Sequence, residues 1–447
     1  MRHSHSSHRP LTARLGGLFV RCGLAGALLA GLPAVAAAQA TATPRPVGAD
    51  NAKPFKVTFG VDYFFQSSTR RDYPYSSDEF KDSESFFWER LRPRVSGTNG
   101  RVSFMIEGQD THSRGSVFTS RTAYLDLLNA WVDVQRPSGL SIRVGRRQGD
   151  FDTITRLVRT PDFAAIVRSF DTAEVGWENK TTEVRGLLFH TVDNVPKSFN
   201  TWKPGERLWT AYGSHRIGRQ RLQTYLTTKI NTVGARSESG VAGDAAVYAW
   251  ETLAAGPIPF GGLTYQVEHI LQRGHVSTDK LRASGLFTSV SKVIHKTDID
   301  FRFNRLSGDK AAGDGVRNTY DPFYMANAQF SSLGIMRGSN LTNYSAIVTQ
   351  TFSQKAQLIL RFYDSHLTSR SDGWYMGSSA SQRQTLVRPT ATSSKIGDEL
   401  DAQFTYAVSP KLNVRSGVYK MWTGPYVTET GNHGSPYELR LQIFGRF

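Results

Sequence analysis

Residues 437–447 alternate between two kinds of side chain. One set is mostly apolar and comprises Tyr437, Leu439, Leu441, Ile443, Gly445 and Phe447; the other is mostly polar and comprises Glu438, Arg440, Gln442, Phe444 and Arg446. Because side chains alternate across a β-strand, this stretch predicts a strand with one apolar face. A soluble domain seldom leaves such a strand at an edge, whereas a closed barrel in lipid pairs its last strand with its first. The pattern therefore predicts the closing strand of a membrane barrel.

The same alternation recurs along the chain and predicts an all-β, transmembrane antiparallel β-barrel of about 18 strands. Short turns are expected in the periplasm and long loops outside, and an even strand number places both ends of the chain in the periplasm. No repeat of about 40–50 residues supports a propeller, and a soluble sandwich is the other alternative. The predicted strands are 55–65, 85–97, 101–110, 121–135, 139–147, 166–178, 182–193, 206–217, 219–231, 244–255, 262–273, 281–293, 296–306, 341–353, 355–368, 395–408, 411–421 and 435–447.

Composition agrees with this fold class. Beyond the N-terminus, the sequence has no uncharged apolar run of about 18 residues that would form a spanning helix. The 26 Phe, 17 Tyr and 40 Gly of the chain are typical of a barrel with aromatic belts outside and a polar lumen.

The N-terminus predicts a secretory signal peptide at residues 1–40, followed by a periplasmic leader at 41–54 and the barrel at 55–447. Basic residues precede an apolar segment that ends in Ala38-Gln39-Ala40, and cleavage is expected after Ala40, with Ala38 as the alternative. The expected location is the bacterial outer membrane. Cys22 is the only cysteine, so the mature chain would have neither disulfides nor thiolate metal sites.

The chain is strongly basic. Removal of the four arginines of the signal would lower the formal net charge from +16 to +12. Such a charge indicates anionic partners, namely lipopolysaccharide, an acidic polymer or a small anion, although solvated surface charge is the plain alternative.

Alternation also assigns charged residues to the lumen. Arg90, Arg92 and Arg94 share one face, and each would cost roughly 2–4 kcal/mol at mid-depth in lipid. The same reasoning points Arg143, Arg302, Arg361, Arg415 and Arg440 inward, together with the acids Glu107, Glu268, Asp298, Asp300, Glu399, Asp401 and Glu438. Two interpretations remain open: the arginines pair with carboxylates and brace the wall, or they form a cationic path that selects anions.

Several motifs resemble the alginate export family of outer-membrane barrels. They are ERLRP at 89–93, LLNAWVD at 127–133, IRVGRRQ at 142–148, RSFD at 168–171, IGDELD at 396–401 and GPYV at 424–427. The resemblance implies an 18-stranded barrel whose lumenal arginines form a passage for an acidic polysaccharide. It places Arg92, Arg143, Arg305 and Arg415 in that passage, with Glu399 and Asp401 as acidic partners, although periodicity puts Arg305 on the other face.

No motif indicates catalysis, because the histidines are scattered without metal-ligand spacing. We therefore expect no enzyme activity, no cofactor or metal, and no nucleic-acid binding. The predicted function is an outer-membrane channel for an acidic polysaccharide or other anion, working with periplasmic export partners. The alternatives are a general small-solute porin and a plugged structural or adhesive barrel. The sequence leaves open whether loop 307–340 or loop 148–165 gates the pore.

Overall fold

The computed structural model describes residues 54–73, 83–115, 123–149, 151, 154–160, 164, 166–195, 198–376, 385–386, 391–431 and 434–447. The predicted signal peptide and residues 41–53 of the predicted leader lie outside them.

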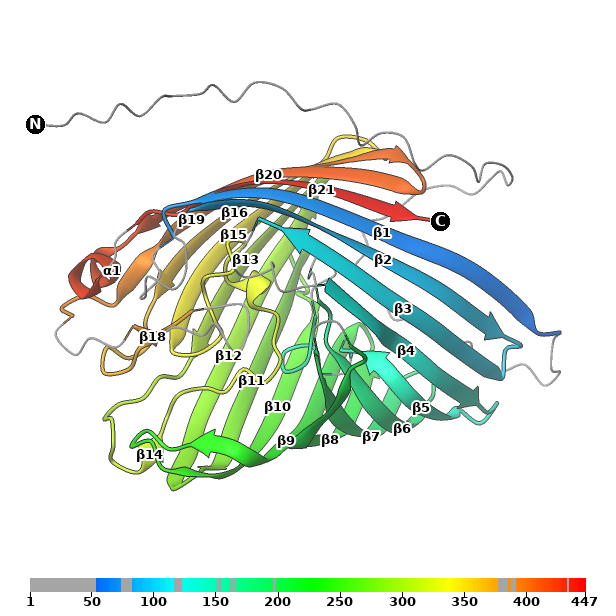
Figure 1. Ribbon diagram of the computed structural model, residues 1–447, viewed down its shortest axis with the longest axis horizontal. Coiled ribbons are helices and arrows are strands. Elements are labelled where there is room, and N and C mark those ends of the chain that lie inside the picture. Colours follow the sequence, from blue (N-terminus) through cyan, green and yellow to red (C-terminus); the bar gives the residue numbers. More distant parts are fainter. Residues whose placement is uncertain are drawn as a thin grey trace, which may run out of the picture. The chain divides into compact units, whose positions relative to one another are not determined.

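The described residues form a closed antiparallel barrel with a wall of eighteen strands (Figure 1). Each wall strand pairs with the next one along the chain, and the last, β21, pairs with β1 to close the ring. This confirms the predicted fold class and strand number. The wall strands are β1 (Lys56–Arg71), β2 (Glu84–Thr98), β3 (Val102–Arg114), β4 (Ala123–Gln135), β5 (Leu140–Gln148), β6 (Ser169–Glu178), β7 (Thr182–Asp193), β8 (Thr201–Ile217), β9 (Gln220–Arg236), β10 (Ala242–Pro257), β11 (Leu263–Val276), β12 (Asp279–Ile294), β13 (Thr297–Leu306), β15 (Leu341–Thr351), β16 (Ala356–His366), β19 (Lys395–Ser409), β20 (Leu412–Thr423) and β21 (Tyr437–Arg446).

Several strands continue beyond their predicted ends. β1 runs to Arg71 rather than to residue 65, through the polar stretch Gln66-Ser67-Ser68-Thr69-Arg70. That stretch has no apolar alternation, but its backbone pairs with β2 on one side and β21 on the other. Hydrogen bonding to two neighbours therefore extends the strand where the side-chain pattern gives no signal.

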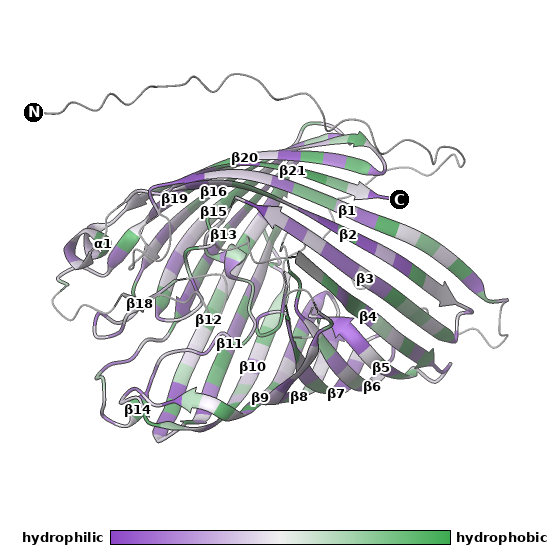
Figure 2. Ribbon diagram, in the orientation of Figure 1, coloured by the Kyte–Doolittle hydropathy of each residue, from purple (hydrophilic) through white to green (hydrophobic). Residues whose placement is uncertain are grey.

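The outward face of the wall is apolar, and Figure 2 shows the alternation along β1 and β2. In the closing strand, Leu439 and Leu441 are exposed, whereas Glu438 and Gln442 are buried inside. Gly445 lies on the outward face, where a Cβ atom would come within 2.7 Å of the Phe447 ring. The terminal aromatic ring therefore covers the position where an apolar side chain would otherwise stand.

Connections at the periplasmic end are short, such as 99–101, 179–181 and 410–411. The long connections lie at the extracellular end, except that 277–278 and 237–241 are short there too. Small elements within the long connections are β14 (Val316–Arg317), η1 (Asn327–Gln329), β17 (Trp374–Tyr375), β18 (Thr385–Leu386) and α1 (Pro425–Thr430). In the described part of the chain, no helix has the length and apolar character needed to cross a membrane.

An apolar core lies inside the barrel. A barrel with an open, water-filled pore would instead have a polar interior throughout. It combines inward residues of the wall, such as Phe189 and Phe287, with Leu157, Phe323 and Phe330 from two long loops. The described parts of connections 149–168 and 307–340 therefore pack inside the barrel, where Figure 1 shows loop segments between the walls.

Candidate functional site

The two inward loops meet inside the barrel. Val158 and Tyr324 form an isolated parallel β-bridge. The Tyr324 amide donates to the Leu157 carbonyl at 2.8 Å, and the Arg159 amide donates to the Tyr324 carbonyl at 3.1 Å. The Tyr324 ring packs edge-on against Phe170 of β6. Both loops left open as gate candidates by the sequence thus fold inward, and they are joined to each other.

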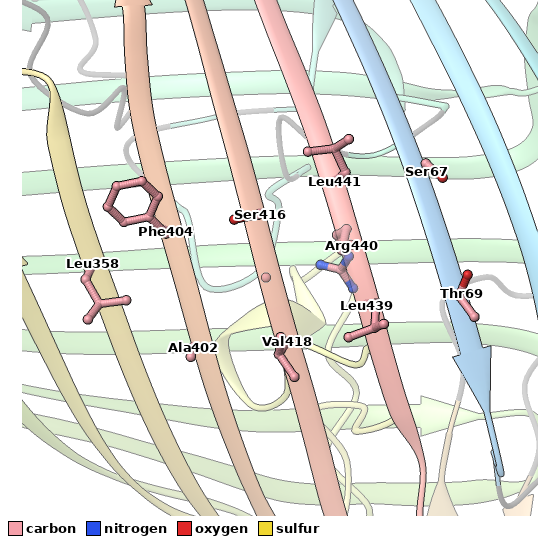
Figure 3. Close-up of a pocket in the computed structure, with 11 residues that line it drawn as sticks. Ser67, Thr69, Leu358, Ala402, Phe404, Ser416, Val418, Leu439, Arg440 and Leu441 are labelled. Carbon is pink, nitrogen blue, oxygen red and sulfur yellow. The ribbon is translucent and has the colours of Figure 1, made fainter.

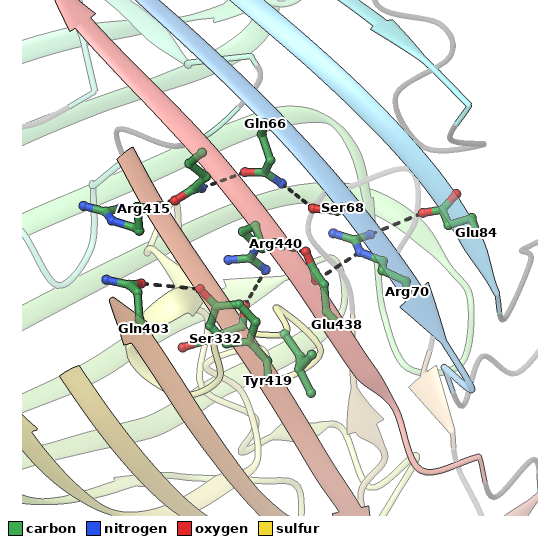
Figure 4. Close-up of polar contacts among 12 residues, drawn as sticks. Gln66, Ser68, Arg70, Glu84, Ser332, Gln403, Arg415, Tyr419, Glu438 and Arg440 are labelled. Carbon is green, nitrogen blue, oxygen red and sulfur yellow. Dashed lines mark hydrogen bonds and ion pairs between the residues drawn. The ribbon is translucent and has the colours of Figure 1, made fainter. Parts of the chain in front are cut away.

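Loop 307–340 is anchored to the wall at β19 by one carboxylate. Glu399 accepts hydrogen bonds from the Ser331 hydroxyl at 2.6 Å and from the Ser332 and Leu333 amides at 2.7 and 3.2 Å. Arg440 of β21 donates to the Ser332 carbonyl at 3.0 Å, as Figure 4 shows. Glu399, assigned by sequence to the solute path, is therefore engaged by the loop.

The same loop is held from the other side of the lumen by β9 and β11. Asp321 forms an ion pair with Lys229, and its backbone carbonyl accepts a hydrogen bond from Gln272 at 2.7 Å. Burial raises the pKa of Asp321, but the adjacent Lys229 ammonium more than offsets this and holds that pKa at about 2. The loop therefore crosses the lumen from β9 to β19, and a side chain of the wall, Lys229 or Glu399, holds it on each side.

The first inward loop also reaches the wall. Arg156 donates to Glu268 of β11 at 2.9 Å and to the Gln329 side chain of the second loop. Its guanidinium lies 4.7 Å from the centre of the Phe287 ring. One arginine thus ties the first loop to the second loop and to the wall.

Two of the four predicted lumenal arginines on β2 and β5 form ion pairs with neighbouring carboxylates. Arg94 pairs with Asp62, and Arg143 pairs with Asp133, each at 2.7 Å. Arg302 on β13 likewise contacts Asp300 on the same strand at 2.5 Å. At these positions the arginines pair with carboxylates and brace the wall, which was the first of the two interpretations.

Arg90 and Arg92 face inward and are each 6% exposed. Arg92 donates to the amide oxygen of Gln109 at 3.0 and 2.9 Å and to that of Gln148 at 3.5 Å. Arg90 donates to the Ala164 carbonyl in the first inward loop. These contacts use uncharged acceptors, which satisfy the donors without adding negative charge.

On the opposite wall, Arg361 of β16 and Asp401 of β19 are direct cross-strand neighbours. Nη1 of Arg361 and both carboxylate oxygens of Asp401 are buried, and none has a hydrogen-bond partner among the described residues. Further along the wall, Arg415 donates to the Gln442 amide oxygen at 3.4 Å and lies 4.7 Å from the centre of the Phe444 ring.

Arg305 does not line the lumen. It is exposed on the outward face of β13, which it shares with Phe301, while its neighbours Asn304 and Leu306 point inward and are buried. The resemblance placed Arg305 in the passage, and strand alternation excludes it, because adjacent residues of a strand point to opposite faces.

Sequence reasoning missed several lumenal cations. Arg185 on β7 and Arg147 on β5 both contact Glu174, at 3.3 and 2.6 Å. Arg185 stands between Val184 and Gly186, so alternation could have found it. Arg156 lies in a loop, where no periodicity exists to indicate its direction.

Two grooves lie on the outer surface of the barrel. One of about 520 Å³ is lined by outward residues of β1, β16, β19, β20 and β21, among them Leu358, Phe404 and Leu439 (Figure 3). A second, of about 350 Å³, is lined by Phe301, Phe303 and Tyr344. Their apolar outward side chains face lipid, so neither groove belongs to the passage.

The contact between the two loops is directly testable, because Cys22 is the only native cysteine. The variant Val158→Cys with Tyr324→Cys is expected to form a disulfide, since paired backbone segments lie about 4.8 Å apart, a separation that a disulfide can span. Gel mobility with and without reductant measures it. Val158→Cys with Ser331→Cys is the matched control, because Ser331 is held at Glu399 on β19. Equal cross-linking in both variants, or none in either, would contradict the contact.

Comparison with known proteins gives a consistent result. The family model for alginate export matches residues 64–439. No curated protein sequence matches the chain. The fold is similar to that of OpdK from Pseudomonas aeruginosa, an outer membrane protein, with a TM-score of 0.59 and 12% identity over 87% of this chain and 98% of that one.

Two further structures from the same organism were solved with carboxylate ligands. OccK2 (OpdF) in complex with glucuronate has a TM-score of 0.58 and 12% identity, covering 88% of this chain and 96% of that chain. OpdK with vanillate has a TM-score of 0.57 and 13% identity, covering 87% and 98%. At these identities the likeness shows a shared outer-membrane porin fold.

Proposed function

The chain belongs to the alginate export family, and on this basis we propose that its lumen passes an acidic saccharide or a comparable small anion. The barrel is an outer-membrane channel for solutes, and the proposal concerns which solutes it selects. It assigns no chemical reaction to the chain.

The observation that carries the proposal is the position of the Arg361 side chain in the lumen. Its side chain is partly exposed on the inward face of β16, two residue pairs to the periplasmic side of the Tyr363–Glu399 pair where loop 307–340 is anchored. Its Nη1 has no hydrogen bond within the described chain. Nη1 itself is buried, but the side chain as a whole is partly exposed. A guanidinium has five donors in a planar fork that fits a carboxylate, so an anion passing this point would meet the exposed part of the Arg361 side chain.

Arg415 extends this path toward the periplasm. It lies on the inward face of β20, opposite Thr405, four residue pairs beyond Asp401 and Tyr419. Its contact with the Gln442 amide contributes no negative charge. Cations that follow one another along a lumen can exchange a carboxylate through weak successive contacts, so that the solute both enters and leaves.

The solved relatives support a carboxylated solute without establishing one here. The OccK2 structure contains glucuronate, a sugar acid. Uronates combine a carboxylate with a sugar ring, and the proposed path supplies an arginine beside an aromatic ring at Arg415 and Phe444.

A general small-solute porin is the second candidate. The ion pairs of Arg94, Arg143 and Arg147 with carboxylates favour it, because a paired arginine contributes little net charge to the passage.

The two candidates differ in their response to charge removal. Arg361→Gln with Arg415→Gln is expected to lower the anion-over-cation permeability ratio about 30-fold, since two unit charges are removed and each contributes on the order of 1 kcal/mol near the ion path in water. Reversal potentials in planar bilayers under a salt gradient measure this ratio. Block of the parent current by glucuronate oligomers should weaken in the same variant.

Arg305→Gln is the matched control, because Arg305 lies on the outward face and its loss should leave selectivity unchanged. A parent channel that is unselective and indifferent to glucuronate would support the general porin instead. A barrel that carries no current at all would support the plugged alternative.

A further inference from the structure

The outward face of β11 and β12 carries a dense group of basic residues at its extracellular end. The strands are joined by the two residues 277–278, and their register places Arg273 opposite Arg282 and His275 opposite Lys280. Arg273, Lys280 and Arg282 are all exposed. We call Arg273, Lys280, Arg282 and the nearby Arg305 the outward basic patch.

The nearby carboxylate of Asp244 contacts His275 at 3.5 Å rather than a member of this patch. Among the described residues, none of its four members forms an ion pair with a carboxylate; Arg273 donates to the Gln272 and Ala283 backbone carbonyls at 2.8 and 3.4 Å. Like charges directly opposite on neighbouring strands are destabilising. The Arg273–Arg282 pair is therefore unfavourable unless an external anion lies between the two guanidiniums.

The patch stands at the level where lipid headgroups begin. Tyr248 of β10 lies opposite Arg273, and Trp250 lies opposite Leu271; both aromatic side chains are exposed on the outward face. Exposed Tyr and Trp mark the boundary between hydrocarbon and headgroups in outer-membrane barrels. Below them the exposed side chains are apolar, as at Val267 and Val290.

Arg305 adds a cation from the adjacent strand. It is the next-to-last residue of β13, opposite Leu286 of β12, and exposed on the same outward face. Because Arg305 faces away from the lumen, solute passage does not explain its position, whereas membership of this patch does.

From this geometry we propose that the outward basic patch binds the phosphate groups of a phosphorylated glycolipid of the outer leaflet, of the lipopolysaccharide class. Guanidinium groups match phosphate oxygens bidentately, and a headgroup phosphate beside Arg273 and Arg282 would relieve their mutual repulsion. The glycolipid acyl chains would then lie along the apolar wall beneath. The site is independent of solute passage, because its residues face away from the lumen.

The test measures binding of purified phosphorylated lipid A to the delipidated barrel in detergent by native mass spectrometry. Arg273→Gln with Arg282→Gln is expected to weaken binding about 30-fold, the product of two contributions from basic residues at an anionic lipid surface. Lys292→Gln is the matched control, since Lys292 is exposed on the same face of β12 at its periplasmic end. It should bind as the parent does.

Two further binding measurements identify the ligand. Lipid A stripped of its phosphates should bind weakly to every variant, and millimolar inorganic phosphate should not displace the intact lipid. Unchanged single-channel conductance of the double variant will show that its barrel is folded. Equal affinity of the double variant and the parent, equal binding of the stripped lipid, or displacement by free phosphate would each overturn the proposal.

Discussion

Replacing residues 321–338 by a short Gly-Ser linker is expected to raise the single-channel conductance several-fold. This segment crosses the lumen between Lys229 on β9 and Glu399 on β19, and it supplies Phe323, Phe330 and Leu333 to the apolar core inside the barrel. Its removal would exchange packed side chains for water inside the barrel. Conductance in planar bilayers measures the change.

The structure makes this deletion practicable. The amides of Tyr320 and Asn340 both donate to the Ser307 carbonyl, at 2.9 and 3.2 Å, so the two ends of the segment lie side by side. A linker of a few residues can join them without strain on β13 or β15.

A matched deletion keeps the inward segment intact. Residues 311–314 are exposed at the tip of the same loop, and their removal should leave conductance unchanged. If the lumenal deletion conducts no better than the parent, loop 307–340 does not limit passage.

The second large effect concerns the seam where the barrel closes. Glu438→Ala is expected to destabilise the folded barrel by roughly 3–5 kcal/mol, the cost of removing one partner from a buried ion pair. Glu438 is fully buried and accepts hydrogen bonds from Arg70 of β1 at 3.2 Å, Arg440 at 2.8 Å and the Tyr73 hydroxyl at 3.1 Å (Figure 4). Its loss would leave two guanidiniums facing each other across the closing strand pair.

Urea unfolding of the barrel in lipid, followed by heat-dependent gel mobility, measures this free energy. Glu178→Ala is the control, because Glu178 ends β6 at a periplasmic turn and should shift stability by no more than about 0.5 kcal/mol. Glu438→Gln keeps an acceptor and should fall between the two. Equal stability of the Glu438→Ala variant and the parent would show that the seam does not depend on this carboxylate.

The inside and outside faces of the wall followed from local alternation, because a strand has a period of two and lipid excludes charge. That rule placed Arg92, Arg361 and Arg440 inward, and it would have kept Arg305 outward against the family resemblance. It could not say which carboxylate each arginine would meet. Arg143 and Asp133 are neighbours only because β4 and β5 pair in one register.

The loops show most clearly what strand alternation cannot predict. No side-chain pattern in residues 307–340 indicates that Ser331, Ser332 and Leu333 bind Glu399. That contact joins residues far apart in the chain, and it exists only because the closed wall surrounds the loop and brings β19 to it.

Sequence alone thus determined the barrel, its eighteen strands and the direction of most wall side chains, because these depend on neighbours one or two residues away. Only the tertiary structure decided that two loops meet inside the lumen, that Glu399 is an anchor, and that Arg361 keeps a donor unused. Those features depend on which distant strands the closed ring brings within hydrogen-bond distance, and no local pattern encodes that distance.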